Sequence, residues 1–299
     1  MNILITGGSG FVGKALSYYL LGQGHSVTAI GRSSVHQWSG YENFHYISAD
    51  TTQKGAWQDR LQGMDAVVNL AGATIFRRWT KRYKAQIYDS RILTTRNLVA
   101  ALPDNPDVTL CSASAAGYYG SRGEAALSED ARPGDDFLAK VCIAWENEAS
   151  QAKAKGIRVA LMRFGVVLGK GGGAIQKMLL AFKLCAGGPL GNGKHWFPWI
   201  HMADLTAGIC FLLENVDVQG PLNFCAPGQV RNVDFARALG NALNRPAFMP
   251  VPAFMIYLMM GELGTSLLSS QRPVSEKLTG YGFEFKYPGI DNALREIVK

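Results

Sequence analysis

Three glycines near the amino terminus have the spacing of a phosphate-binding turn. Gly7, Gly10 and Gly13 recur every third residue, between an apolar stretch, Asn2–Thr6, and a helical pattern that begins at Phe11. The first glycine allows a tight turn, the second admits a pyrophosphate to the backbone N–H groups, and the third lets helix and strand pack closely. The helix N-terminus adds partial positive charge. The segment predicts a dinucleotide site; an ordinary glycine turn is the alternative.

The residues after the second predicted strand, His25–Ile30, distinguish two forms of the dinucleotide. The sequence continues Gly31-Arg32-Ser33, without a carboxylate. An NAD site usually has an acidic residue here that accepts from the ribose 2′-hydroxyl, whereas the planar fork of an arginine matches a 2′-phosphate. Ser33 adds a hydroxyl donor. We therefore predict NADP(H), with a solvated surface arginine as the alternative.

Hydroxyl groups follow the predicted strand Val108–Ser112. Ser112, Ser114, Tyr118 and Tyr119 lie within eight positions of one another. A hydroxyl at the carboxyl end of a strand can hydrogen-bond a reacting oxygen. We assign this polarising role to Ser114, with Ser112 as the alternate and as a substrate contact; both also suit a strand-to-loop turn.

The elements that position these groups alternate between strands and helices, which predicts an α/β protein with a Rossmann-type, doubly wound parallel sheet and a smaller C-terminal substrate lobe. We expect the NADP-binding domain to span residues 1–165 plus about 200–226 and the lobe to span 166–199 and 227–299. The predicted strands are Asn2–Thr6, His25–Ile30, Phe44–Ser48, Ala66–Leu70, Val108–Ser112, Ile157–Arg163 and Leu222–Cys225. The predicted helices are Phe11–Leu21, Lys81–Leu102, Phe137–Ala154, Ala174–Leu184, Val233–Leu243 and Ala253–Leu268.

Composition excludes several classes of protein. With 299 residues, 47% of them hydrophobic, the chain is long enough for a large core and too apolar for disorder. Five cysteines without a Cys-x-x-Cys pair argue against a disulfide scaffold and indicate a reduced, cytoplasmic protein. The first strand at Asn2 leaves no room for a signal peptide, and the longest apolar run, Val251–Met260, is too short for a membrane helix. The net charge of +7 suits acidic ligands such as phosphates.

The motifs together resemble the extended short-chain dehydrogenase/reductase superfamily, within the NAD(P)-dependent epimerase/dehydratase family. More specifically the chain resembles its atypical SDR39U1-like branch. The segments that carry this resemblance are Thr6–Gly13, Asn69–Ala73, Arg78–Thr80, Ser112–Gly120, Asp136–Lys140, Gly187–Gly191, Trp199–His201 and Gly280–Phe285. The resemblance implies a Rossmann core, NADP(H) and a family-specific C-terminal segment, but no substrate. It implies cofactor contacts at Gly7, Gly10, Phe11, Val12, Gly13, Arg32, Ser33, Asp50, Leu70, Ala71, Gly72, Lys140, Phe164 and Gly165.

The superfamily's usual acid/base pair is missing. In Tyr-x-x-x-Lys the two side chains share a helix face, so that the ammonium lowers the pKa of the phenol. None of the 11 tyrosines has this partner, and Asp136 stands in the tyrosine position before Lys140. The candidates for proton transfer are therefore Tyr118, Tyr119 and Asp136, with Lys140 at the cofactor ribose. One alternative is hydride transfer to an activated acceptor that needs little help from a proton donor, and another is lost catalysis. Asp136 and Lys140 also suit an exposed ion pair.

Further residues are assigned to the substrate. By position, Arg78, Trp199 and His201 are candidates for contact with it, although Trp199 also suits a core and His201 an internal hydrogen bond. His195 and His201 lack further ligands at metal spacing, so we assign no metal. The basic and aromatic run at residues 77–84 favours a helix start with Thr80 as N-cap over nucleic-acid binding.

Three functions remain open at this stage. The first is an NADP(H)-dependent oxidoreductase- or epimerase-like enzyme on an unknown small molecule. The second is a catalytically silent NADP(H)-binding regulatory or interaction protein, and the third is a nucleotide-sugar epimerase or dehydratase. By resemblance, two copies of the chain are expected to pair through the helices at residues 81–102 and 137–154, and no membrane association is expected.

Overall fold

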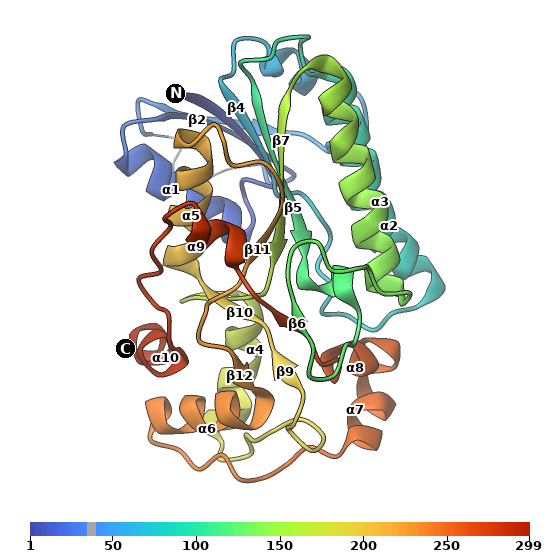
Figure 1. The fold of residues 1–299 in the computed structure, drawn as a ribbon, viewed down its shortest axis with the longest axis vertical. Coiled ribbons are helices and arrows are strands. Elements are labelled where there is room, and N and C mark those ends of the chain that lie inside the picture. Colours follow the sequence, from blue (N-terminus) through green and yellow to red (C-terminus); the bar gives the residue numbers. More distant parts are fainter. Residues whose placement is uncertain (35–39) are drawn as a thin grey trace.

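Seven parallel strands form the central sheet of the computed structural model, which describes residues 1–34 and 40–299. Their spatial order is β11-β7-β5-β4-β1-β2-β3. The inner strands are almost continuously buried runs of Val, Ile, Leu and Ala, as a sheet covered on both faces requires. The predicted doubly wound Rossmann-type sheet is therefore confirmed (Figure 1).

The seven strands of the sheet agree closely with the sequence patterns, whereas the helices at residues 202–214, 276–280 and 290–298 are not among the predicted ranges. The sheet strands are β1 (Asn2–Thr6), β2 (Ser26–Gly31), β3 (Phe44–Ser48), β4 (Ala66–Asn69), β5 (Thr109–Ala115), β7 (Arg158–Phe164) and β11 (Gly220–Phe224). The shorter strands are β6 (Ala126–Leu127), β8 (Val166–Leu168), β9 (Trp196–Phe197), β10 (Trp199–His201), β12 (Val230–Arg231) and β13 (Arg272–Pro273). The α-helices are α1 (Phe11–Gly22), α2 (Lys81–Ala101), α3 (Phe137–Ser150), α4 (Gly173–Lys183), α5 (Met202–Glu214), α6 (Asn232–Leu243), α7 (Ala253–Met260), α8 (Glu262–Leu267), α9 (Glu276–Gly280) and α10 (Ile290–Val298).

Helices cover both faces of the sheet. On one face α1 and α5 pack through residues such as Leu16, Leu20 and Ile209, and on the other α2 and α3 pack through residues such as Leu98 and Ala149. Figure 1 shows these two helical layers on opposite sides of the strands. The predicted cap of α2 is confirmed, because the hydroxyl of Thr80 accepts from the N–H of Tyr83.

The strand order reverses direction between β1 and β4. After β3 at one edge, the chain returns past β1 to β4 and continues toward β11 at the other edge. Ligands of doubly wound sheets bind outside the carboxyl ends of the strands at such a switch point. The glycine turn after β1 and the loop after β4 meet there, because a Cβ on Gly7 would lie 2.9 Å from the backbone of Leu70 and Ala71.

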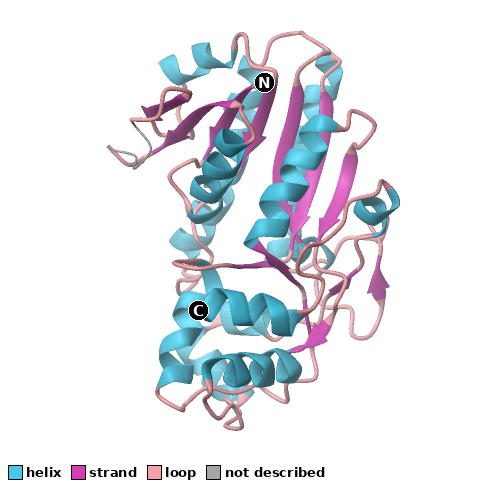
Figure 2. Cartoon of the chain, turned by 90° about the vertical axis from the view of Figure 1, so that its left-hand side faces the viewer, coloured by secondary structure: helices cyan, strands magenta, loops and turns pink. Residues whose placement is uncertain are grey.

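A second group of helices lies below this edge of the sheet. The helices α4, α6 and α10 share a core that includes Ile175, Phe235 and Leu294 (Figure 2). One predicted helix, Ala253–Leu268, is divided in the structure into α7 and α8. The division falls at Gly261, whose φ of 60° is outside the helical range.

None of the helices in the described ranges is long and apolar enough to cross a membrane. The five cysteines are free thiols, as a reduced protein requires. Four of them are buried, and Cys185 is exposed.

Candidate functional site

The glycine turn is built by close backbone contacts. Gly7 adopts a φ of 73°, which favours glycine, and the N–H of Gly10 donates to its carbonyl at 2.9 Å. A Cβ on Gly13 would lie 2.3 Å from the carbonyl oxygen of Gly7, so α1 is pressed against the turn. Both glycines are therefore required by the fold itself.

Gly10 is different, because the space beside it is open. A Cβ there would meet only the carbonyl oxygen of Gly7, at 3.0 Å, and the residue is exposed. Gly10 is the N-cap of α1 and supplies no side-chain hydrogen bond to the first turn. The N–H groups of Phe11, Val12 and Gly13 thus start a helix without a side-chain cap, which suits a diphosphate.

A second glycine-rich segment lies against this turn. Cβ atoms on Gly172 and Gly173 would come within 2.4 and 2.8 Å of the ring of Phe11. The segment Gly169–Gly173, which joins β8 to α4, therefore packs on the first residue of α1. Lys170 within it is exposed and pairs with Glu296 of α10 at 3.2 Å. Phe11, Val12 and Gly13 thus lie at the predicted turn. The sequence analysis did not predict that the Gly169–Gly173 loop lies beside them.

Arg32 and Ser33 lie directly beyond β2, and both are exposed. The carbonyl oxygen of Ser33 accepts a hydrogen bond from the hydroxyl of Tyr46 on β3, at 2.9 Å. This contact fixes the backbone after β2 next to the glycine turn, where a Cβ on Gly31 would meet Ser9. The arrangement leaves the guanidinium of Arg32 at the surface, where it is accessible to an anion.

Asp50 forms a turn at the end of β3. Its Oδ1 accepts from the N–H and the hydroxyl of Thr52, at 3.0 and 2.8 Å, while its side chain remains exposed. Asp50 is thus a turn residue in this structure, and the resemblance gave it as a cofactor contact. Thr51 is buried, and its hydroxyl lies 2.9 Å from that of Thr94 on α2.

The loop Leu70-Ala71-Gly72 ends β4 beside the glycine turn, as predicted. It rests on a cation that the sequence reasoning missed, because a Cβ on Gly72 would lie 3.0 Å from the guanidinium of Arg91. Arg91 donates to the carbonyl of Ala73 at 3.1 Å and lies over the ring of Trp145, 5.1 Å from its centroid. Burial lowers the pKa of Arg91. Its place on a predicted helix gave no signal of this contact.

Gly165 and Phe164 follow β7 at the same edge. A Cβ on Gly165 would lie 2.9 Å from the N of Trp199, so β10 packs tightly against this point. The ring of Phe164 makes an edge contact with Phe224, and part of it belongs to the core. Trp145 packs in the same cluster, and its buried Nε1 has no hydrogen-bond partner among the described residues.

The two serines of β5 are both buried and hydrogen-bonded. Ser112 accepts from the amide nitrogen of Asn69 at 3.2 Å. Ser114 donates its hydroxyl proton to Oε1 of Glu146 on α3, at 2.7 Å. Their exposed fractions are 1% and 3%. Because its proton is held by Glu146, Ser114 can accept a hydrogen bond from a ligand but cannot also donate one.

Glu146 belongs to a buried network. Both of its oxygens accept from Arg163 of β7, at 2.8 Å each, in a bidentate ion pair. Arg163 Nη1 also donates to the hydroxyl of Tyr119, which in turn donates to Oδ1 of Asn223 at 2.7 Å. Burial opposes the charge of Arg163, but Glu146 raises its pKa above the ordinary value. Glu146 and Arg163 were not among the predicted site residues, because only the fold brings them together.

The two candidate tyrosines therefore differ in availability. Tyr119 is fully buried, and burial raises its pKa to about 12, so it cannot exchange protons near neutral pH. Tyr118 is half-buried, and its ring lies 3.5 Å from the guanidinium carbon of Arg163. In the described ranges no group hydrogen-bonds the hydroxyl of Tyr118. Of the two phenols, that of Tyr118 is the one accessible to a ligand.

Asp136 and Lys140 lie at opposite ends of the first turn of α3. Asp136 is the N-cap, and its Oδ1 accepts from the N–H of Ala139 at 2.9 Å. Lys140 is exposed, and its ammonium makes no ion pair within the described residues. The ion pair considered between them is not formed. The cap orients the carboxylate of Asp136 toward its own helix, which argues against a role in proton transfer.

Three of the four predicted substrate residues are buried. Trp199 is 1% exposed and donates from Nε1 to the carbonyl of Gly228. His201 is the N-cap of α5, with Nδ1 accepting from Ala203 and Nε2 facing Glu296 at 3.1 Å. These contacts place Trp199 and His201 in the core, against a direct substrate role, and Ser112 is equally enclosed. Arg78 is exposed on the loop after β4.

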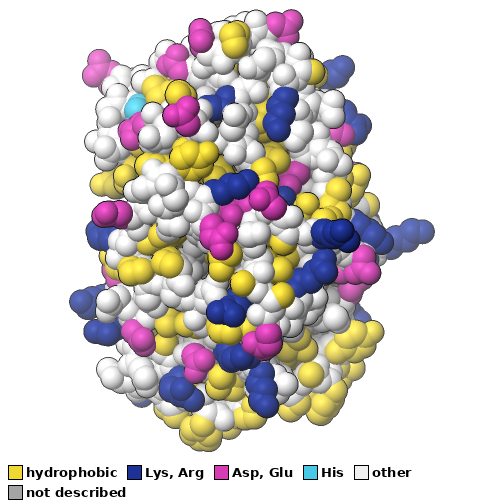
Figure 3. All heavy atoms as spheres, in the orientation of Figure 1, with side chains coloured by type: hydrophobic (Ala, Val, Ile, Leu, Met, Phe, Trp, Pro, Cys, Tyr) yellow, Lys and Arg dark blue, Asp and Glu magenta, His cyan; other side chains and the backbone are white. Residues whose placement is uncertain are grey.

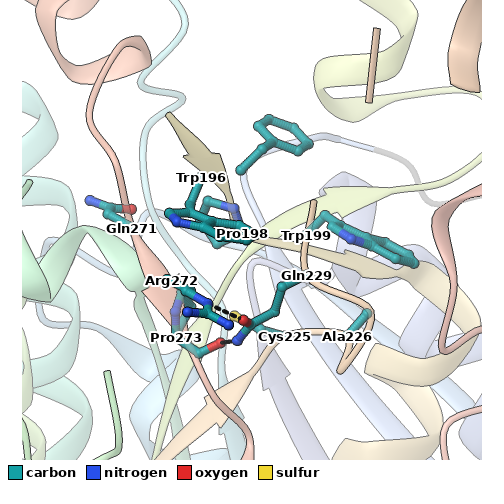
Figure 4. Close-up of a pocket in the computed structure, with 10 residues that line it drawn as sticks. Trp196, Pro198, Trp199, Cys225, Ala226, Gln229, Gln271, Arg272 and Pro273 are labelled. Carbon is teal, nitrogen blue, oxygen red and sulfur yellow. Dashed lines mark hydrogen bonds between the residues drawn. The ribbon is translucent and has the colours of Figure 1, made fainter. Parts of the chain in front are cut away.

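Beside Trp199 there is room for little more than one water molecule. The cavity of about 10 Å³ is lined by residues that include Trp196, Gln229 and Arg272 (Figure 4). Gln229 accepts from Arg272 and donates to the carbonyl of Pro273, and these bonds close the wall. A substrate cannot fit in this cavity.

A larger hollow, of about 660 Å³, lies between the loop before β6 and the segments around α7 and α8. Its walls include Glu124, Asn192, Lys194, His195 and Leu268. The Nε2 atom of His195 is buried and lacks a hydrogen-bond partner in the described part of the chain. Burial lowers the pKa of His195, so the ring is neutral at physiological pH. The sequence analysis considered His195 only as a metal ligand and did not place it beside Lys194 in a cavity.

Charged side chains of both signs are interspersed over the face shown in Figure 3, and no continuous basic band crosses it. Surface ion pairs such as Lys84–Glu262 and Arg231–Glu124 also join charges of opposite sign. This face therefore offers no support for nucleic-acid binding.

Two family models match the chain. The NAD dependent epimerase/dehydratase family matches residues 3–225, and a domain of unknown function, DUF1731, matches residues 251–297. The first match includes the parallel sheet except for Asn2, and the second begins just before α7.

Relatives resemble the chain over its full length. "Epimerase family protein SDR39U1 homolog, chloroplastic" from Arabidopsis thaliana is 38% identical, covering 100% of this chain and 87% of that protein. The Bos taurus protein "Epimerase family protein SDR39U1" is 38% identical over 100% of both chains, and "Epimerase family protein YfhF" of Bacillus subtilis is 36% identical over 100% and 98%.

Solved structures share the fold. The human epimerase family protein SDR39U1 (isoform 2), crystallised with NADPH, superposes with a TM-score of 0.87 at 33% identity, covering 99% of each chain. A Thermus thermophilus UDP-glucose 4-epimerase in complex with NAD has a TM-score of 0.82 at 18% identity, covering 100% of this chain and 98% of its own. The second likeness concerns the fold alone.

Proposed function

Because the chain belongs to the NAD dependent epimerase/dehydratase family, and to its SDR39U1 type, we propose that it is an NADP(H)-dependent oxidoreductase- or epimerase-like enzyme that acts on a small molecule. The main support for this proposal is the glycine turn at the start of α1, which has no side-chain cap, together with the exposed Arg32 after β2. A relative of the same type is crystallised with NADPH, which supports the choice of the phosphorylated cofactor.

The residues present fit a dinucleotide. The open space above Gly10 admits a diphosphate to the first-turn N–H groups of α1, and Arg32 is placed for a 2′-phosphate. The loop Leu70-Ala71-Gly72 lines the same edge, with Lys140 exposed at the start of α3 for a hydroxyl of the sugar. The cofactor, when bound, supplies or accepts a hydride.

Proton transfer is assigned to Tyr118. Its phenol is partly exposed, and its ring lies over the guanidinium of Arg163, 3.5 Å from ring centroid to guanidinium carbon. Arg163 is held by the two oxygens of Glu146, so the charge beside Tyr118 is fixed in position. Ser114 donates to the same carboxylate and helps to hold it, because at 3% exposure it is as enclosed as Ser112. In this assignment Tyr118 takes the place of the missing tyrosine.

The hollow between β6 and α7 is proposed to receive the substrate. Lys194 and the unpartnered Nε2 of His195 offer a cation and a hydrogen-bonding group, and Leu268 and Ala253 offer an apolar wall. These groups suit a molecule with an anionic or hydroxylated end and an apolar part. Arg78, exposed on the loop after β4, is a further anchor for an acidic substrate. Pairing of two chains through α2 and α3 stays a prediction.

Cofactor titration followed by a substrate screen tests the proposal. Calorimetry should show NADPH binding at least about tenfold more tightly than NADH, a difference of about 1.4 kcal/mol. With NADPH present, absorbance at the nicotinamide band is then followed against carbonyl, enone and nucleotide-sugar compounds. Equal affinity for both cofactors would contradict the assignment of Arg32.

Variants separate an enzyme from a silent binding protein. For a compound that is turned over, Tyr118→Phe should lower kcat by about 10²- to 10⁴-fold, the usual contribution of general acid–base catalysis. Asp136→Asn retains a helix cap and should leave kcat nearly unchanged. If no compound reacts, the regulatory or interaction protein is the better explanation. If a compound reacts and Tyr118→Phe leaves kcat unchanged, the assignment of proton transfer to Tyr118 is wrong.

A further inference from the structure

Three side chains of metal-binding type meet at the amino-terminal edge of the sheet, opposite the glycine turn. His25 immediately precedes β2, and Cys210 and Glu214 lie one helical turn apart at the end of α5. His25 Nε2 is 4.0 Å from Cys210 Sγ, and Sγ is 3.4 Å from Oε1 of Glu214. The three ligand atoms all lie within 4.8 Å of one another.

The donor set and its dimensions suit zinc. An imidazole nitrogen, a thiolate sulfur and a carboxylate oxygen are the ligand types that Zn²⁺ takes in proteins. Bond lengths of about 2.0–2.1 Å to nitrogen and 2.3 Å to sulfur place those atoms roughly 3.5 Å apart in a tetrahedron. The observed 4.0 Å closes to that value by a small rotation of the half-buried His25 ring. Three protein ligands leave one position for water.

The surroundings give an ion both access and enclosure. Glu214 is exposed, whereas the thiol of Cys210 is 4% exposed, so an ion enters past the carboxylate and ends against the sulfur. Nδ1 of His25 faces away from the cluster, toward the amino group of Met1 at 3.4 Å. Tyr19 of α1 completes the wall, and its pKa is raised by burial and then by Cys210 and Glu214.

We propose that His25, Cys210 and Glu214 form a Zn²⁺ site that ties the end of α5 to the start of β2. Without the ion, the thiol of Cys210 donates its proton to Glu214. On binding, that proton is released to solvent, a sulfur–zinc bond forms, and the carboxylate turns from the thiol to the ion. The ring proton of His25 moves from Nε2, which becomes the ligand, to Nδ1, and the Met1 ammonium, which faces Nδ1 without the ion, turns away to solvent. The expectation of no metal rested on His195 and His201; this cluster joins residues 185 positions apart. The site is independent of the proposed cofactor function.

Cobalt serves as the spectroscopic probe. The full chain, free of any polyhistidine tag and treated with a chelator, is titrated with Co²⁺. One equivalent should produce a thiolate-to-cobalt charge-transfer band in the near ultraviolet and raise the melting temperature, and Zn²⁺ should then remove the band. Absence of the band in the unaltered protein overturns the proposal.

Matched variants locate the ligands. Cys210→Ser should abolish the band, whereas Cys185→Ser, at the exposed cysteine, should leave it unchanged. His25→Gln and Glu214→Gln should each weaken Zn²⁺ affinity more than about 100-fold, beyond the roughly 10- to 100-fold cost of losing an outer contact alone. A band that survives Cys210→Ser, or is lost in Cys185→Ser, overturns the site. If Cys210→Ser does not fold, the test uses Glu214→Gln instead, because Glu214 is exposed. An unchanged Zn²⁺ affinity in that variant would contradict the proposed site.

Discussion

The two halves of the candidate site are built in opposite ways. In the nucleotide half, the backbone shapes the proposed binding turn through the close contacts of Gly7 and Gly13 and the open space at Gly10. In the half assigned to proton transfer, buried side chains shape the site through the Glu146–Arg163 ion pair and its bonds to neighbouring hydroxyls. A backbone turn depends on a few local residues, whereas a side-chain network depends on several distant ones.

This difference separates two kinds of outcome. Arg32 and Gly10 are exposed, so their substitution should alter cofactor affinity with little change in folding. Glu146 and Arg163 are buried charges, and each is stable in the interior only because of the other. This contrast would be wrong if substitutions in the two halves changed cofactor affinity and folding stability in the same way.

The largest effect is expected for Arg163→Ala. The change leaves the carboxylate of Glu146 buried without its cation, which should lower the free energy of unfolding by about 3–5 kcal/mol. Urea denaturation measures it. Arg96→Ala is the matched control, because it removes a bidentate partner of Glu148 at the surface and should change stability little. Equal losses in the two variants would show that the network does not hold this half together.

The next largest effects are expected for two glycine substitutions, Gly13→Ala and Gly10→Ala. Gly13→Ala places a Cβ 2.3 Å from the carbonyl oxygen of Gly7, and such overpacking should cost about 1–3 kcal/mol of stability along with NADPH binding. Gly10→Ala should fold normally and weaken NADPH at least about tenfold, because its methyl group projects toward the diphosphate. Thermal melts and calorimetry separate the two effects. Normal NADPH affinity in Gly10→Ala would exclude this turn as the binding site.

Arg32→Ala should act on one cofactor only. Loss of the charge-assisted bonds to a 2′-phosphate should weaken NADPH by about 1.5–3 kcal/mol, and NADH affinity should change little. Calorimetry with both cofactors provides the measurement. Parallel losses for NADPH and NADH would remove the basis for preferring the phosphorylated form.

The smallest effect concerns pH. Burial lowers the pKa of His195, so the unfolded chain binds a proton more readily than the folded one below about pH 6.5. Stability should therefore fall as the pH drops through that range, and His195→Gln should reduce the slope. Urea midpoints across the acidic range measure it. An unchanged slope in His195→Gln would assign the acid sensitivity to other groups, such as His201, whose pKa burial also lowers.

Much of the fold followed from local patterns. Asn2–Thr6 and Phe44–Ser48 are strands with the predicted bounds, and the N-cap at Thr80 was read from its position before a helical pattern. The division at Gly261 was not predicted, because a single glycine within an apolar helical run is compatible with either outcome until the chain is packed.

The sequence by itself determined the nucleotide half, because glycine spacing and the residue after β2 act within a few positions of one another. Only the tertiary structure decided which hydroxyl is free, since the partners of Ser114 and Tyr119 come from α3, β7 and β11. It also decided that Trp199 is core, and that His25 meets Cys210 and Glu214. Local backbone chemistry is written in adjacent residues, whereas burial and long-range contacts exist only once the sheet and its helices have assembled.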